Sequence, residues 1–160
     1  MNETPEKPPL PETFQPLIDA FNAIPQGRAI GLSVVDVALG TGVMRLPSNL
    51  ALAGHPVEPL LHPGAITTLL DTVGALAVFS RLDGKRLIAT LDMRVDYMRP
   101  ANLAKDLLGE AECYRLGQEI AFVRGRAGEA DGGRDVATFS AAYMLTDPIP
   151  EPAPCPEPSA

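Results

Sequence analysis

The sequence predicts an α+β protein in which one long apolar helix packs against a curved antiparallel sheet. A short helix and a strand hairpin are expected first, and the segment from Leu60 to Phe79 then carries a single formal charge, on Asp71. Alternating polar and apolar segments separated by turn residues follow to about residue 145. The order is therefore strands, one long helix and then a run of antiparallel strands. This order is typical of an α+β fold with the helix on one face of the sheet.

Composition and charge narrow the class of protein. With 160 residues, 46% hydrophobic and 21% charged, the chain suits one soluble domain with a real core. A net charge of −7 argues against nucleic acid and anionic membranes as partners. Cys113 and Cys155 form no metal-ligand or redox motif. The first residues lack the apolar core of a signal peptide, and polar residues interrupt the apolar helix, so we expect a cytoplasmic protein without a membrane span.

Proline marks the two ends of the chain. Residues 1–11 contain four prolines and residues 148–160 contain six. Both ends are expected to be extended, disordered tails, because they offer no core-forming pattern. The folded domain is therefore predicted over residues 12–147, and no internal repeat is visible.

The elements before the long helix follow from local patterns. Apolar residues at helical spacing predict a short helix over 12–23. Gly40-Thr41-Gly42 predicts a hairpin turn between two strands. The expected elements are, in order, a helix over 12–23, strands over 29–39 and 43–46, a loop over 47–59 and the long helix over 64–80.

Four strands are expected after a turn at 83–85, over 88–97, 107–115, 119–128 and 135–145. The first of them alternates strictly. One face is expected to cover the helix and the other to face solvent. The predicted helix-facing set is Leu91, Met93, Val95 and Tyr97, and the predicted outer set is Thr90, Asp92, Arg94 and Asp96.

The long helix is apolar nearly all round, and Gly74, Ala75 and Ala77 allow close approach. A helix of this kind must be covered on every side, whereas one sheet covers only one side. A second copy of the chain is the simplest remaining cover, which predicts a homo-oligomer.

Asp71 is the first candidate for chemistry. A carboxylate in an apolar stretch is costly to bury unless it is paired or used. In the structural interpretation, Asp71 bonds to backbone, Thr67 or Thr72. In the functional one, it is a general base that activates water or a nucleophile that attacks a carbonyl. We favour the functional interpretation, since an unpaired carboxylate in an apolar helix needs a reason.

Three features together resemble the hotdog-fold acyl-CoA thioesterases of the PaaI-like (phenylacetate-pathway) type. They are His62-Pro63-Gly64, the Asp71-Thr72 pair nine residues after His62, and a strand that ends in Tyr97-Met98-Arg99-Pro100. The resemblance covers about residues 28–146. It implies the hotdog fold, a homodimer or homotetramer, acyl-CoA as substrate and no separate cofactor or metal.

The resemblance also implies roles for single residues. Asp71 would do the chemistry, and Thr90 of the other subunit would hold the attacking water. Thr is also common in strands, so Thr90 has an equally good structural explanation. His62 would orient the loop or cap the helix, and Arg99 would meet a phosphate of CoA, or else be an ordinary surface arginine.

The helix start departs from the family pattern. The family has Gly after the His and uses its N–H for the oxyanion, whereas Pro63 has no N–H. Proline is also simply favoured at the first helical position. The next donors are the N–H groups of Gly64 and Ala65. Pro56 stands where the family often carries Asn.

A second resemblance concerns His55, which precedes Pro63-Gly64 as the catalytic His does in β-hydroxyacyl-ACP dehydratases. In those enzymes the Gly N–H polarises the thioester carbonyl, but their acidic position is Leu69 here. His55 has an ordinary loop role as its other explanation. Three functions therefore stay open: a thioesterase, an acyl-CoA-binding hotdog protein with little turnover, and a dehydratase-like lyase using His55.

Overall fold

The computed structural model describes residues 12–82 and 86–148. The predicted tail at 1–11, most of the one at 148–160 and the predicted turn at 83–85 lie outside the described residues. Pro148 is the exception, because the last strand runs on to it. None of the helices in the described ranges is long and apolar enough to cross a membrane.

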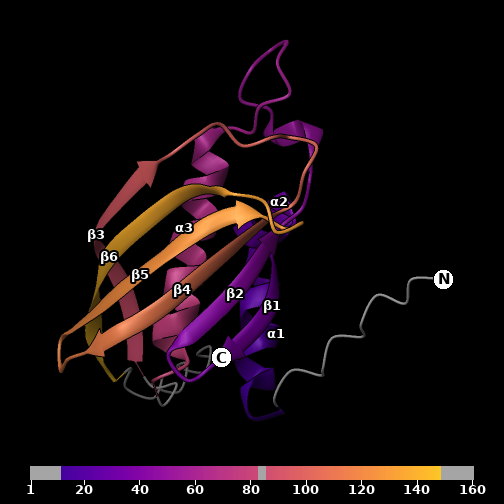
Figure 1. Ribbon diagram of the computed structural model, residues 1–160. Coiled ribbons are helices and arrows are strands. Elements are labelled where there is room, and N and C mark those ends of the chain that lie inside the picture. The colour runs from indigo at the N-terminus through magenta and orange to yellow at the C-terminus, as the bar shows by residue number, and fades with distance from the viewer. Residues whose placement is uncertain (1–11, 83–85, 149–160) are drawn as a thin grey trace, which may run out of the picture.

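The described strands form one antiparallel sheet in the order β1-β2-β4-β5-β6-β3 (Figure 1). The sheet curves around α3 (Pro63–Phe79), which lies along one of its faces. The predicted α+β class is therefore confirmed. The strands are β1 (Ser33–Ala38), β2 (Thr41–Leu46), β3 (Arg86–Tyr97), β4 (Leu107–Leu116), β5 (Ile120–Glu129) and β6 (Asp135–Pro148).

The N-terminal part contains one helix more than predicted. A 3-10 turn, η1 (Glu12–Phe14), leads into α1 (Gln15–Ala23), and α2 (Pro25–Ile30) follows. The predicted strand over 29–39 was wrong at its start. Pro25 favours a helix start, and Gly31 ends the helix with a φ of 80°, a conformation that suits glycine. A short η2 (Leu50–Leu52) lies in the predicted loop.

The helix α3 is apolar over most of its circumference, as predicted, and the sheet leaves one side of it half-buried. Its buried side carries fully covered residues such as Leu69, Val73 and Leu76. A half-buried stripe runs along the rest of it and consists of Thr67, Thr68, Asp71, Thr72, Ala75 and Phe79. The threonine hydroxyls donate to backbone carbonyl oxygens one turn earlier in the helix. Thr68 Oγ1 donates to Gly64 O at 3.0 Å, and Thr72 Oγ1 donates to Thr68 O at 2.7 Å. This stripe is the open face of α3.

A β-bulge changes the predicted facing of β3. The pairing with β6 runs Thr90↔Tyr143 and then Asp92↔Ala142, so one extra residue, Leu91, is inserted in β3. Thr90 consequently faces the helix, although alternation had placed it on the outer face. Leu91 is 53% exposed, although it had been assigned to the helix-facing set. A bulge shifts the alternation by one residue. The predicted facing is therefore wrong at Leu91 and before it, at Thr90.

Candidate active site

Asp71 lies in the middle of α3 on the open face. Thr90 Oγ1 donates a hydrogen bond to its Oδ1 at 2.8 Å. The hydroxyl of Tyr143 lies 3.0 Å from the backbone oxygen of Asp71 and 3.3 Å from Oδ1. Among the described residues no donor reaches Oδ2. The carboxylate is thus held through one oxygen, while the other has no donor among the described residues.

The Asp71–Thr90 contact is made within one chain. The family resemblance implied that Thr90 comes from the other subunit, and the structure differs on this point. The bulge at Leu91 is the physical reason, because it rotates Thr90 toward α3 of its own chain. The carboxylate and its threonine therefore form a unit before any partner is considered.

Tyr143 was missed by the sequence analysis. It lies on β6, its residue is 1% exposed, and its hydroxyl reaches α3. Burial, followed by the nearby charge of Asp71, raises the pKa of Tyr143 far above its ordinary value, so the hydroxyl keeps its proton. The only sequence signal was a tyrosine at an inward position of an alternating strand, where its hydroxyl needs a partner.

The backbone N–H groups at the start of α3 already have hydrogen-bond acceptors within the same chain. His62 is the N-cap residue, and its Nδ1 accepts from the N–H of Gly64 at 2.9 Å. The carbonyl oxygen of His62 accepts from the N–H of Ala65 at 3.0 Å. Pro63 occupies the first helical turn, as predicted, and supplies no N–H. Both predicted oxyanion donors thus already have acceptors, and both come from His62.

The helix start and the carboxylate of one chain are well separated. Asp71 follows Gly64 by seven positions along α3. At 1.5 Å of rise per residue, this is about 10 Å along the helix axis. One thioester carbonyl cannot contact both groups of the same chain.

Two hollows lie beside the helix start. One of about 260 Å³ opens between α3, α2 and the η2 segment, and its lining includes Gly64, Ala65, Thr68 and the apolar Leu52. The other, of about 450 Å³, is lined by His55, Pro63, Tyr97 and Arg99 together with apolar neighbours. The predicted helix-start donors and the predicted substrate-binding residues therefore border open space.

Tyr97 was also missed as a contact of the helix start. Its hydroxyl lies 2.6 Å from Thr67 Oγ1 and 3.1 Å from the carbonyl oxygen of Pro63. It ties the end of β3 to the first turn of α3. The Tyr-Met-Arg-Pro segment is thereby fixed beside the helix start.

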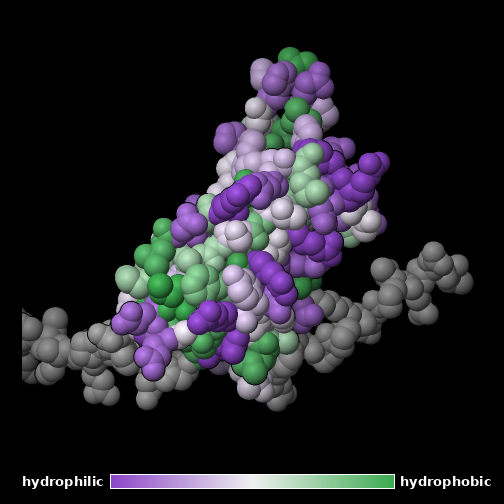
Figure 2. Space-filling model, turned by 60° about the vertical axis from the view of Figure 1, so that its left-hand side comes forward, coloured by the Kyte–Doolittle hydropathy of each residue, from purple (hydrophilic) through white to green (hydrophobic). Residues whose placement is uncertain are grey.

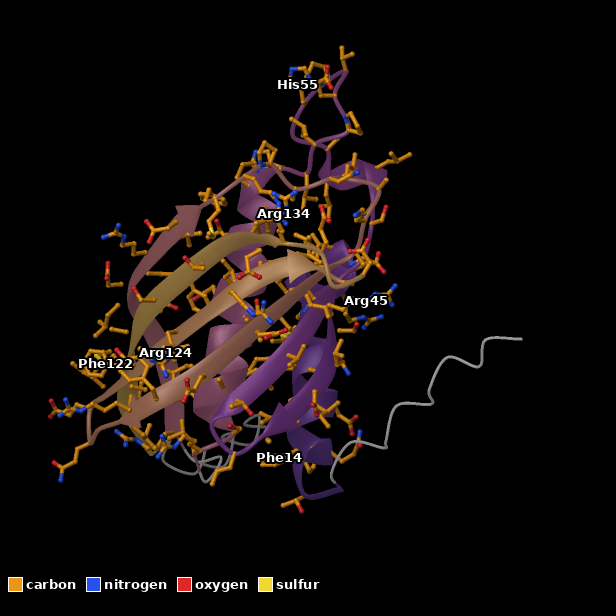
Figure 3. The ribbon with its side chains drawn as sticks, viewed as in Figure 1. Phe14, Arg45, His55, Phe122, Arg124 and Arg134 are labelled. Atoms are coloured by element: carbon orange, nitrogen blue, oxygen red, sulfur yellow. The ribbon has the colours of Figure 1, made fainter. Side chains whose placement is uncertain are left out.

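His55 lies at the tip of a loop that projects from the body of the protein (Figure 3). Its Nδ1 accepts from the backbone N–H of Glu58 at 2.9 Å and of Val57 at 3.3 Å, so it stabilises this turn. Leu69, which stands where a dehydratase would have its acid, is fully buried in the core. The structure does not bring His55 together with Asp71.

Arg99 is half-buried and forms no ion pair within the described residues. It borders a further hollow of about 620 Å³, which it shares with Arg126, Arg134 and Asp135. Arg126 pairs with Asp135 at 2.8 Å, whereas Arg134, like Arg99, forms no ion pair among the described residues. Two free guanidinium groups therefore lie beside one hollow, in a chain that is acidic as a whole.

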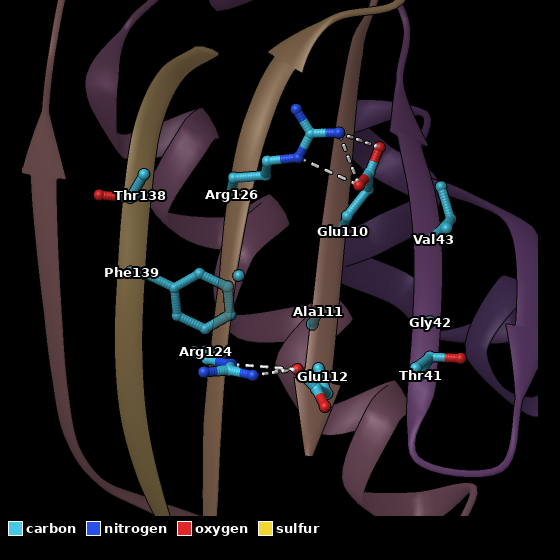
Figure 4. Close-up of a pocket in the computed structure, with 11 residues that line it drawn as sticks. Thr41, Gly42, Val43, Glu110, Ala111, Glu112, Arg124, Arg126, Thr138 and Phe139 are labelled. Atoms are coloured by element: carbon cyan, nitrogen blue, oxygen red, sulfur yellow. Dashed lines mark hydrogen bonds and ion pairs between the residues drawn. The ribbon is translucent and has the colours of Figure 1, made fainter. Parts of the chain in front are cut away.

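The sheet face opposite α3 carries a hollow of about 600 Å³ (Figure 4). Its charged residues are paired across β4 and β5: Arg124 with Glu112 at 2.9 Å and Arg126 with Glu110 at 2.9 Å. None of the predicted site residues lines it. We therefore place the candidate site on the α3 side of the sheet.

Comparisons with known proteins bear on the fold and the family. Residues 59–135 match the model of the thioesterase superfamily. This segment contains α3, β3 and the site residues His62, Asp71 and Thr90. A candidate esterase from Halobacterium salinarum is 38% identical over 94 residues, which cover 57% of this chain and 61% of that protein.

Solved structures give the same fold. A Pseudomonas aeruginosa protein is 37% identical, with 81% of this chain and 98% of that one covered and a TM-score of 0.71. The Escherichia coli PaaI protein of the phenylacetic acid degradation operon superposes with a TM-score of 0.75, covering 84% of this chain and 94% of that one. At 16% identity this second likeness concerns the fold alone. The chain has the hotdog fold, and its residues 59–135 are similar to the thioesterase superfamily.

Proposed function

We propose that the protein is an acyl-CoA thioesterase of the PaaI-like type, which uses water to convert a small or medium acyl-CoA to the free acid and CoA. The observation that carries the proposal is the state of Asp71. Its Oδ1 is held at 2.8 Å by Thr90, and Oδ2 is left without a donor among the described residues on the open face of α3. A fixed carboxylate with one free oxygen suits a general base or a nucleophile.

Two routes use this oxygen. As a base, Oδ2 takes a proton from water while the water oxygen attacks the thioester carbonyl, and CoA leaves as the thiol once it has been protonated. As a nucleophile, Oδ2 attacks the carbonyl itself, CoA leaves, and water then hydrolyses the mixed anhydride. In both routes Thr90 keeps the carboxylate in place.

The carbonyl oxygen needs a donor of its own as negative charge develops on it. The Gly64 N–H of the same chain is about 10 Å away along α3, too far for one carbonyl. We infer that the donor comes from the helix start of a second copy. The thioester oxygen would replace His62 Nδ1 as the acceptor of the Gly64 N–H, which rotation of the exposed His62 side chain permits.

A homodimer, or a homotetramer built from it, supplies this second copy. The half-buried stripe of α3 remains to be covered, and the neighbouring edge strand β3 exposes Leu87 and Leu91 by 51% and 53%. Figure 2, which brings this side forward, shows hydrophobic side chains gathered on the surface. A partner packed here would cover this apolar surface and would also complete the site.

The 260 Å³ hollow beside the helix start and the 620 Å³ hollow beside Arg99 suit different parts of an acyl-CoA. The apolar lining that Leu52 and its neighbours give to the 260 Å³ hollow suits a small acyl group. The free guanidinium groups of Arg99 and Arg134 suit the phosphates of CoA, since arginine binds phosphate in a planar, two-pronged manner.

One observation favours the second candidate, an acyl-CoA-binding protein with little turnover. The N–H groups of Gly64 and Ala65 already have acceptors in His62. If His62 keeps them when substrate binds, the oxyanion has no donor. The dehydratase-like alternative has no such support, because Leu69 is buried where an acid would be needed.

The test is a thiol-release assay over short, long and aromatic acyl-CoAs, with the parent and Asp71→Asn. We expect the parent to release CoA and the variant to lose at least about 10²-fold in kcat. Asp92→Asn is the matched control, since Asp92 is exposed on β3 and forms no ion pair within the described residues. Unchanged turnover in Asp71→Asn would contradict the mechanism. Binding without thiol release would favour the carrier, and loss of a hydroxyl without thiol release would favour the lyase.

A further inference from the structure

We propose that Tyr143 is a positioning residue of this site: its hydroxyl and that of Thr90 together hold Oδ1 of Asp71, which makes Oδ2 the reacting oxygen. The inference rests on the proposed thioesterase function and deepens it. It assigns a role to a residue that neither the sequence motifs nor the family resemblance singled out.

The two hydroxyls come from one cross-strand pair. Thr90 on β3 and Tyr143 on β6 are directly opposite in the register. Directly opposite residues of an antiparallel pair point to the same face, here toward α3. The bulge at Leu91 sets this register, so the same irregularity that turns Thr90 inward also places it beside Tyr143.

Packing fixes the hydroxyl of Tyr143. The residue is 1% exposed, and its oxygen lies beside Gly74, three residues after Asp71 on α3. A Cβ atom built on Gly74 would overlap that oxygen and would lie 3.2 Å from the ring of Phe139. Glycine at this position therefore provides the space that the hydroxyl occupies.

The hydroxyl is a donor toward Asp71. An ionised carboxylate only accepts hydrogen bonds, and Tyr143 has one proton to give. That proton is shared between the backbone oxygen at 3.0 Å and Oδ1 at 3.3 Å. Because burial and the charge of Asp71 raise the pKa of Tyr143, it keeps this proton throughout the working pH range.

Two donors on one oxygen define the orientation of the carboxylate. A half-turn about the Cβ–Cγ bond gives back the same arrangement, because the two oxygens of a carboxylate are equivalent, whereas a smaller rotation lengthens the hydrogen bonds from both donors. Oδ2 then stays directed away from both donors. Since Tyr143 is buried behind Asp71 and lines none of the hollows described beside the helix start, its loss should affect the chemical step and not substrate binding.

The decisive variant is Tyr143→Phe, which removes only the hydroxyl. We expect kcat for thiol release to fall about tenfold, because small misplacement of a reacting group is costly, while KM stays within about twofold. Tyr114→Phe is the matched control, since Tyr114 is 50% exposed on β4. A purely structural role would lower the fraction of folded protein without this selective fall in kcat.

Thr90 provides a second arm that does not depend on Tyr143→Phe folding. Thr90→Val should lower kcat about tenfold, and Thr90→Ser, which restores the hydroxyl, should recover most of that loss. The double variant Thr90→Val/Tyr143→Phe should lose more than the product of the single losses, because each single variant keeps one donor on Oδ1 and the double variant keeps none.

The outcomes separate the two proposals. A parent protein that releases no thiol from any acyl-CoA overturns the proposed function and this inference with it. An active parent whose kcat is unchanged in Tyr143→Phe overturns the inference alone. If that variant does not fold, unchanged kcat in Thr90→Val overturns the inference in the same way.

Discussion

The middle and the start of α3 satisfy their polar groups in opposite ways. In the middle, Asp71 receives hydroxyl donors from two strands that are distant in sequence, Thr90 on β3 and Tyr143 on β6. At the start, the N–H groups of Gly64 and Ala65 bond to His62, their immediate neighbour. Tertiary structure therefore prepares the carboxylate, whereas local capping occupies the amides.

This difference has a chemical consequence. The carboxylate is assembled within one chain and keeps one oxygen free. The amides must exchange an acceptor before they can bind an oxyanion, and they lie about 10 Å from the carboxylate of their own chain. In the proposed mechanism one chain carries two half-sites, and a complete site needs two chains.

The largest expected effect follows from separating the chains. We expect the protein in solution to have at least twice the 16.9 kDa mass of one chain at micromolar concentration. Thiol release per chain should disappear on dilution below the dissociation constant of the assembly. Sedimentation and activity over the same dilution series measure both. A stable monomer with full thiol release would show that the start and the middle of one helix work without a partner.

The sequence predicted the start of α3 better than its middle. The Pro63 helix start and the capping position of His62 depend on neighbouring residues, and local spacing revealed them. The Asp71–Thr90 contact depends on a bulge at Leu91, for which alternation gives no signal. The contact of Tyr143 with Asp71 joins residues 72 positions apart in the sequence. It depends on the register between β3 and β6, which a single sequence does not reveal. The α+β class was predictable because it follows from the order of elements.

Four of the six residues of the half-buried stripe on α3 are polar: Thr67, Thr68, Asp71 and Thr72. Thr67, Thr68 and Thr72 look compatible with an apolar helix because their hydroxyls bond to carbonyl oxygens one turn earlier. Asp71 is therefore not isolated in an apolar surface. It lies among small hydroxyl side chains on a face that the sheet leaves open.

A smaller effect is expected from crowding the middle of the helix. Gly74→Ala would place a Cβ against the Tyr143 hydroxyl. We expect the free energy of unfolding to fall by about 1–3 kcal/mol, as overpacking does elsewhere, and kcat to fall because the hydroxyl must move away from Asp71. Chemical denaturation and thiol release measure the two effects.

Gly27→Ala is the control for the glycine change, because a Cβ there meets ordinary contacts, the nearest at 3.6 Å. Its kcat should equal that of the parent. If Gly74→Ala keeps both stability and kcat, the packing around Tyr143 does not fix the carboxylate.

The smallest effect is expected at the helix start, from Pro63→Gly. The change adds one N–H at the first helical turn, where the family pattern has it. An oxyanion donor can be worth roughly 3 kcal/mol where it is required. If the Gly64 N–H of a second copy already supplies that donor, the added N–H is not needed and kcat should stay within about twofold. The free energy of unfolding should fall by about 0.4–1 kcal/mol, since glycine has more freedom in the unfolded chain. Pro25→Gly, at the equivalent place in α2, should show the same stability loss without any change at the site. A rise of tenfold or more in kcat for Pro63→Gly alone would mean that His62 keeps the native amides occupied, and the acyl-CoA-binding function would then be the better one.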